Sequence, residues 1–150
     1  MTLSSRLNEL LTRYGYFASR NGYYICRDQV KTSKIFDTIR FGAEIDAKKF
    51  NYPKEIGSIP VTYIRDLTAG YDSSQLDLRP ILPCSESSQM LTIKLSNGCC
   101  ITLRTSGTEP KIKYYVEMSG VSADNVKSAL DTTFNLAIDQ LLQPVYNELA

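Results

Sequence analysis

The chain has 150 residues, and its 17 basic and 16 acidic side chains leave a formal net charge of +1. A charge this close to zero excludes the broad electrostatic attraction by which many proteins bind nucleic acids or anionic membranes, so an anion would have to bind at a local site. No apolar run approaches the roughly 18 residues of a membrane span, and four cysteines without a secretory signal favour a cytoplasmic protein with reduced thiols.

An amphipathic helix is predicted for residues 3–14. Its apolar side chains recur at helical spacing and form one stripe: Leu3, Leu7, Leu10, Leu11 and Tyr14. Gly15 follows directly and is a suitable residue to end the helix. If this stripe stays exposed, it would favour association or docking.

An extended segment and a second helix are predicted next. Residues 16–26 are rich in aromatic side chains, which favour strands, and Gly22 predicts a break within them. Asp28 is a suitable N-cap for the helix, and Gly42 would end it. The apolar side chains of this helix are Ile35, Phe36 and Ile39.

The middle of the chain has weaker patterns. Residues 43–58 mix charges with Pro and Gly and predict a loop over the surface. Residues 59–64 predict a strand. Residues 68–88 are polar and show no clear period, so we expect a long mobile loop.

A β-hairpin is predicted for residues 91–103, where apolar and polar residues alternate on both sides of a central turn. A two-residue Asn-Gly turn would pair Leu95 with Cys100, whereas a three-residue turn pairs Leu95 with Cys99. Only the second register places every apolar residue on one face, with Gly98 left-handed, and we prefer it for that reason.

A last strand and a last helix complete the predicted fold. Residues 111–118 alternate, so that Lys111 and Lys113 share the face opposite the apolar one. Ser122 would start a helix that Pro144 ends. The elements add up to about four strands, mostly antiparallel, and two or three helices that cover one face, which is an α+β two-layer domain.

The stretch Arg104-Thr105-Ser106-Gly107-Thr108-Glu109-Pro110-Lys111 has the composition of a local anion site. In the preferred hairpin register Arg104 points away from the core, and its guanidinium matches a phosphate in two places. Gly107 permits a turn in which successive N–H groups converge, and the neighbouring hydroxyls add donors. The alternative is an ordinary polar turn between two strands. The predicted phosphate-binding residues are Arg104, Thr105, Ser106, Gly107, Thr108 and Lys113, with Thr105 serving mainly the strand and turn.

This stretch resembles the phosphate-binding loop of the α-D-phosphohexomutases. Three flanking stretches, 64–72, 87–90 and 113–115, are similar to the branch that includes phosphopentomutase and glucose-1,6-bisphosphate synthase. The resemblance covers only the carboxyl-terminal quarter of such a four-domain enzyme. It implies that residues 1–14 are a helix at the end of the preceding domain and that residues 15–150 form the phosphate-binding C-terminal domain.

The resemblance also implies a mechanism whose reactive groups are missing here. In the family a phosphoserine donates its phosphoryl group, a loop of three aspartates holds Mg²⁺, and a bisphosphate intermediate turns round between two transfers. The chain has no histidine for a Ser-His-Asn segment and no Asp-x-Asp-x-Asp run. We therefore expect no catalytic residue, metal site or cofactor on this chain, an inactive isolated chain, and Mg²⁺ and the phosphoserine in the full-length enzyme.

The expected role is to hold the non-reacting phosphate of a sugar phosphate, which could be glucose-1-phosphate, ribose-1-phosphate or a bisphosphate. Glu109 would repel that phosphate and is expected to pair with Lys111 or with another domain. The expected partners are the sugar phosphate and the other domains of the enzyme, without nucleic acid or membrane. Two alternatives remain open: a stand-alone, non-catalytic phosphate- or protein-binding module, and the same domain of another mutase such as phosphoacetylglucosamine mutase.

Overall fold

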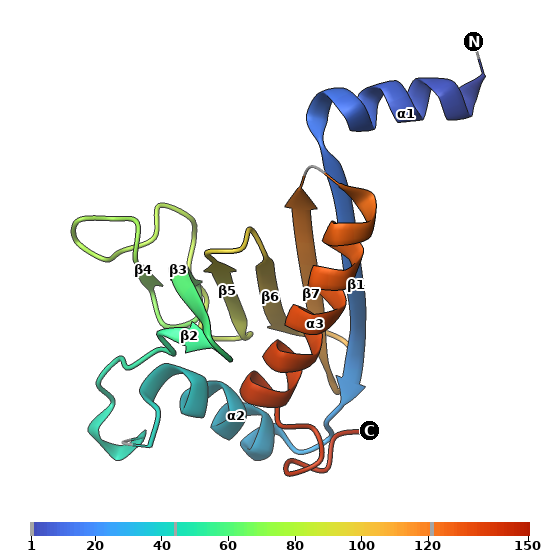
Figure 1. Cartoon of the computed structure of the whole chain (residues 1–150). Coiled ribbons are helices and arrows are strands. Elements are labelled where there is room, and N and C mark those ends of the chain that lie inside the picture. The colour runs from blue at the N-terminus through green and yellow to red at the C-terminus, as the bar shows by residue number, and fades with distance from the viewer. Residues whose placement is uncertain (1, 44, 121) are drawn as a thin grey trace.

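The computed structural model describes residues 2–43, 45–120 and 122–150. In these described residues, three helices, a short 3₁₀ turn and seven strands follow one another (Figure 1). The helices are α1 (Leu3–Tyr14), α2 (Gln29–Phe41) and α3 (Ala123–Leu141), and the 3₁₀ turn η1 is Ile45–Ala47. The strands are β1 (Tyr16–Ile25), β2 (Glu55–Ile56), β3 (Ile59–Asp66), β4 (Tyr71–Asp72), β5 (Met90–Leu95), β6 (Cys100–Thr105) and β7 (Lys111–Gly120).

The strands form one antiparallel sheet in the order β1-β7-β6-β5-β3-β2, with β4 paired to β3. Helix α3 runs along β7 and β1, and α2 lies beside its C-terminal end, so both helices are on the same side of the sheet (Figure 1). Burial of apolar side chains between these layers stabilises the fold. The predicted α+β two-layer class is confirmed, although the sheet has more strands than the four expected.

The core follows the alternation of the strands. Every second residue of β5, β6 and β7 is buried against the helices, and the intervening residues lie on the opposite face of the sheet, which we call the open face. In these three strands the most deeply buried side chains are Leu91, Ile93, Ile101, Leu103, Ile112 and Val116, and the helices add Phe36, Leu130, Ala137 and Ile138.

The preferred hairpin register is confirmed. Ile93 pairs with Ile101 and Leu91 with Leu103, while the Leu95 N–H donates to the carbonyl of Cys99 at 2.8 Å. Gly98 has a φ of 85°, the left-handed conformation that the three-residue turn requires.

The break predicted at Gly22 is wrong. The strand β1 runs through Gly22, which pairs with Tyr114 of β7. A Cβ added at Gly22 would lie 2.4 Å from the Tyr114 hydroxyl, so the glycine serves a close side-chain approach and leaves the strand intact.

The segment 68–88 contains more structure than the predicted loop. Strand β4 pairs with β3 within it, and the Ser73 N–H donates to the Ile64 carbonyl at 2.9 Å. At its other end the Thr68 hydroxyl donates to the Ser88 carbonyl at 3.0 Å. Hydrogen bonds therefore hold the first residues of this segment against β3 and join its two ends, Thr68 and Ser88, to each other.

Helix α1 extends away from the rest of the chain and buries no residue (Figure 1). Its apolar stripe is exposed, with 94% of Leu3 and 62% of Tyr14 accessible to solvent. The assignment of this helix to a preceding domain stays a prediction. In the described part of the chain, no helix combines the length and the apolar character needed to cross a membrane.

Candidate functional site

The motif lies where β6 ends and β7 begins. Arg104 and Lys113 face each other across these two strands, and their neighbours Leu103 and Ile112 are buried in the core. Because side chains alternate along a strand, Arg104 and Lys113 both lie on the open face. The predicted outward orientation of Arg104 is therefore confirmed.

The charge of Arg104 is available to a ligand. Its Nη2 donates to the Tyr115 hydroxyl at 3.2 Å, and the guanidinium carbon lies 5.7 Å from the centre of that ring. Among the described residues, no carboxylate lies within ion-pair distance of Arg104 or Lys113. Two cations without a carboxylate partner thus stand side by side at the base of the loop, an arrangement that attracts anions.

The loop between them, residues 106–110, offers fewer backbone donors than the sequence predicted. The Ser106 N–H donates to the Lys111 carbonyl at 3.0 Å and is not free for a ligand. The N–H groups of Gly107 and Thr108 have no partner among the described residues. Both residues are exposed, so these two N–H groups, together with the hydroxyls of Ser106 and Thr108, are the donors that an anion could reach.

Gly107 does not have a left-handed backbone conformation. A Cβ added there would meet no atom within 4 Å. What Gly107 contributes is therefore open space beside the exposed N–H groups.

Glu109 and Lys111 neutralise each other at the far side of the loop. Lys111 Nζ lies 2.8 Å from Glu109 Oε1, as the sequence predicted, and 4.0 Å from the centre of the Tyr23 ring. The hydrogen bond from Lys111 holds the pKa of Glu109 below its usual value, and the charge of Lys113 acts in the same direction. Glu109 is therefore paired with Lys111, although it also interacts electrostatically with Lys113.

Thr105 is tied to the neighbouring strand. Its hydroxyl oxygen accepts from the Gln89 N–H at 2.9 Å, and its own N–H donates to the Gln89 carbonyl at 3.0 Å. The expectation that Thr105 serves mainly the strand and turn fits these contacts.

A buried polar network, which no sequence pattern indicated, connects to the loop through Gln89. Arg40 is 4% exposed and Asp66 is fully buried; Arg40 Nε and Nη2 donate to the two Asp66 oxygens at 2.6 and 3.2 Å. Tyr52 donates its hydroxyl to Asp66, and Arg40 Nη2 also donates to Gln89 Oε1. We call Arg40, Tyr52, Asp66 and Gln89 the Asp66 network. Asp66 and Gln89 belong to two of the flanking stretches that carried the family resemblance.

The pKa values within the Asp66 network follow from burial and charge. Burial raises the pKa of Tyr52, and the neighbouring carboxylate of Asp66 raises it further. Burial opposes the charge of Arg40, but the hydrogen bonds and the charge of Asp66 outweigh it and raise the pKa of Arg40. At neutral pH Arg40 is therefore charged and Tyr52 is protonated, and Arg40 contacts the Asp66 carboxyl group directly.

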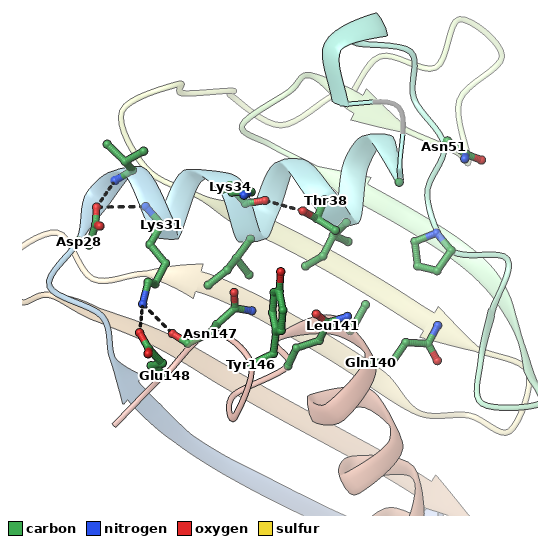
Figure 2. A pocket seen from close by; sticks show the side chains of 16 residues that line it. Asp28, Lys31, Lys34, Thr38, Asn51, Gln140, Leu141, Tyr146, Asn147 and Glu148 are labelled. Atoms are coloured by element: carbon green, nitrogen blue, oxygen red, sulfur yellow. Dashed lines mark hydrogen bonds and ion pairs between the residues drawn. The ribbon is translucent and has the colours of Figure 1, made fainter.

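A cleft of about 860 Å³ lies elsewhere, between α2 and the segment after α3 (Figure 2). Lys31 from α2 reaches across it, with its Nζ 3.0 Å from Glu148 Oε2 and 3.0 Å from the Asn147 carbonyl (Figure 2). None of the predicted phosphate-binding residues lines this cleft. The candidate site is instead a corner on the surface of the sheet.

The sequence of the chain was compared with those of known proteins. No model of a protein family matches the chain. The chain is 40% identical to human phosphopentomutase over 148 residues and 40% identical to human glucose 1,6-bisphosphate synthase over 153 residues, which is 96% and 99% of the chain and 24% of each relative. It is also 36% identical to the phosphoribomutase of Saccharomyces cerevisiae over 140 residues, 88% of the chain and 22% of that relative.

The chain thus spans about a quarter of the length of the curated relatives it matches. The resemblance predicted from the motif and its flanking stretches is confirmed. The chain corresponds to one domain, the C-terminal one, of a phosphohexomutase-like enzyme in the branch of phosphopentomutase and glucose-1,6-bisphosphate synthase.

Proposed function

We propose that the chain holds the non-reacting phosphate of a sugar phosphate while other domains of the enzyme move the phosphoryl group through a bisphosphate intermediate. The observation that carries this proposal is the corner of the sheet where, among the residues that the structure describes, Arg104 and Lys113 have no carboxylate partner and the N–H groups of Gly107 and Thr108 have no acceptor. Phosphate has the charge and the number of acceptors to use all of these groups at once.

The exposure of the corner suits a transient clamp. Charged hydrogen bonds that face water contribute little against hydration and salt, so the isolated domain would bind phosphate with a Kd of roughly 1 mM or weaker. In the whole enzyme, closure of this domain over the substrate would exclude water and strengthen the same bonds. Opening would then release the phosphate, which a bisphosphate intermediate needs in order to turn round.

We assign the reactive groups to the rest of the enzyme. The phosphoserine donor and Mg²⁺ would be supplied by its other domains, and this chain would contribute position and charge neutralisation. The partners would accordingly be a sugar phosphate and those domains.

Amide-shift titration by NMR tests the proposal. We expect inorganic phosphate, ribose-1-phosphate and glucose-1-phosphate to shift the amides of residues 104–113 alike, and glucose to shift none of them. A chain whose loop amides stay unmoved while the phosphate concentration rises well above the millimolar range would overturn the assignment.

The exposed stripe on α1 favours a second candidate, a non-catalytic interaction module. Leu3, Leu7 and Tyr14 are all more than half exposed, and such surfaces usually contact another protein. Strong self-association in analytical ultracentrifugation, together with loop amides that do not respond to phosphate, would support this candidate over the first. A monomer that binds phosphate would exclude it.

A further inference from the structure

The loop that carries the free N–H groups is fastened at both ends. At its start, Thr105 and Gln89 exchange two hydrogen bonds, one through each backbone N–H. At its end, the Cys26 N–H donates to the Pro110 carbonyl at 2.8 Å. The position of Gln89 therefore sets where the loop leaves the sheet.

Gln89 is itself held by Arg40, another member of the Asp66 network. Its side-chain oxygen accepts from Arg40 Nη2, and Arg40 is fixed by two bonds to Asp66. The separations along the chain, 26 residues from Arg40 to Asp66 and 49 from Arg40 to Gln89, show that distant segments meet at this point.

The turn after β3 also holds the residues on either side of Gln89. Asp66 Oδ1 accepts the N–H groups of Thr68 and Ala69, each at 3.0 Å. The Thr68 hydroxyl then donates to the Ser88 carbonyl at 3.0 Å and accepts from the Met90 N–H at 2.9 Å. Asp66 thus fixes both neighbours of Gln89 through one turn and Gln89 itself through Arg40.

Fold stability alone does not account for a buried arrangement of this kind. An ion pair removed from water contributes little net stability, because the loss of hydration offsets the attraction between the charges. A fully satisfied polar network does, however, specify one geometry, since every alternative leaves a buried group without a partner. Loops built from small exposed residues lack such specification of their own.

We propose that Gln89 is a positioning residue for the loop 106–110 and that the Arg40–Asp66 pair orients it. The inference rests on the proposed function, because positioning of the loop matters for activity only if the loop binds phosphate. Holding the free N–H groups of Gly107 and Thr108 in place before the ligand arrives lowers the ordering cost of binding.

Substitution of Gln89 separates this role from general stability. Gln89→Met keeps the length of the side chain and removes its acceptor, and we expect the Kd for inorganic phosphate to rise about two- to tenfold, as for the loss of one hydrogen bond. Gln89→Glu restores an acceptor toward Arg40 and should recover the wild-type positioning of the loop, while its added negative charge would lower the affinity for phosphate. Tyr52→Phe is the matched control, because it removes a bond to the same Asp66 without touching Gln89.

Hydrogen exchange without ligand gives a readout that is independent of the proposed function. The informative amides are those of Thr105 and Ser106, because their N–H groups donate to the Gln89 and Lys111 carbonyls, whereas those of Gly107 and Thr108 have no partner among the described residues. Exchange of the Thr105 and Ser106 amides should accelerate in Gln89→Met but not in Tyr52→Phe or Gln89→Glu. If exchange and affinity change equally in Gln89→Met and Tyr52→Phe, or do not change in Gln89→Met, the positioning role is wrong. If exchange responds as expected while the wild-type chain binds no phosphate, the positioning role holds and the proposed function fails.

Discussion

Replacing Arg104 by methionine gives the most direct measure of how the corner binds phosphate. Methionine keeps much of the aliphatic length of the side chain, and the Tyr115 hydroxyl loses only one long contact of 3.2 Å that partly faces solvent. Because Arg104 lies on the open face, the substitution should leave the core and the thermal stability nearly unchanged. A change in phosphate affinity would then report on the ligand contact alone.

The expected change in the Kd for phosphate follows from how exposed Arg104 is to solvent. A hydrogen bond to a charged partner contributes about 1.5–3 kcal/mol when it is well shielded. Arg104 is only partly buried, so the lower end of that range applies, and the Kd for phosphate should rise about tenfold. Arg104→Lys keeps the charge but not the planar fork, and its effect should be intermediate.

The assay is an NMR titration of wild type and variants with inorganic phosphate at low ionic strength. Lys94→Met is the matched control, because Lys94 also lies on the open face, on β5, and its loss changes the net charge by the same amount. If Arg104→Met binds as tightly as wild type, or if Lys94→Met weakens binding equally, then Arg104 does not act as a specific phosphate contact.

Three further outcomes are expected. Gly22→Ala should lower the free energy of unfolding by about 1–3 kcal/mol in thermal melts, because its Cβ would lie 2.4 Å from the Tyr114 hydroxyl and 2.8 Å from Cζ of the same ring; an unchanged melting temperature would contradict the close approach. Gly107→Ala should not lower stability, since a Cβ there meets open space, whereas phosphate binding should weaken if the loop N–H groups contact the ligand. The raised pKa of Tyr52 means that its contribution to stability is fully present below the unfolded-state pKa of about 10 and is lost as pH rises above it. Denaturant melts between neutral and strongly alkaline pH should therefore show a shallower decline for Tyr52→Phe than for wild type.

Local patterns were sufficient to predict most of the fold. The three helices follow from apolar periodicity and from caps such as Asp28, whose carboxylate accepts the N–H groups of Val30 and Lys31. The hairpin register followed from the requirement that every apolar side chain share one face, and the orientation of Arg104 followed from that register.

The errors in the fold come from contacts between distant segments. Gly22 looked like a break because nothing local shows that Tyr114 packs against it. Strands β2 and β4 have two residues each, too few for any alternation to be visible, and they exist because β3 provides an edge to pair with.

The structure places Arg104, Lys113 and the loop 106–110 together at one corner of the sheet, but local patterns did not indicate how this corner is built. The motif indicated Arg104 and the loop, yet the engagement of the Ser106 N–H and the ordinary φ of Gly107 depend on the path of the backbone. The Asp66 network could not be predicted because it joins segments 26 and 49 residues apart. The only sign of this network in the sequence was that the residues around Asp66 and Gln89 resemble those of the family.

Helix α1 has a consequence for how the chain unfolds. A helix of 12 residues that buries none of them is only marginally stable in water, since packing supplies most of the stability of protein helices. On heating, α1 should therefore unwind gradually and without a calorimetric peak, while the sheet and its two covering helices melt together at a higher temperature. A protease that cuts within α1 would accordingly leave the melting temperature of the remaining body unaltered.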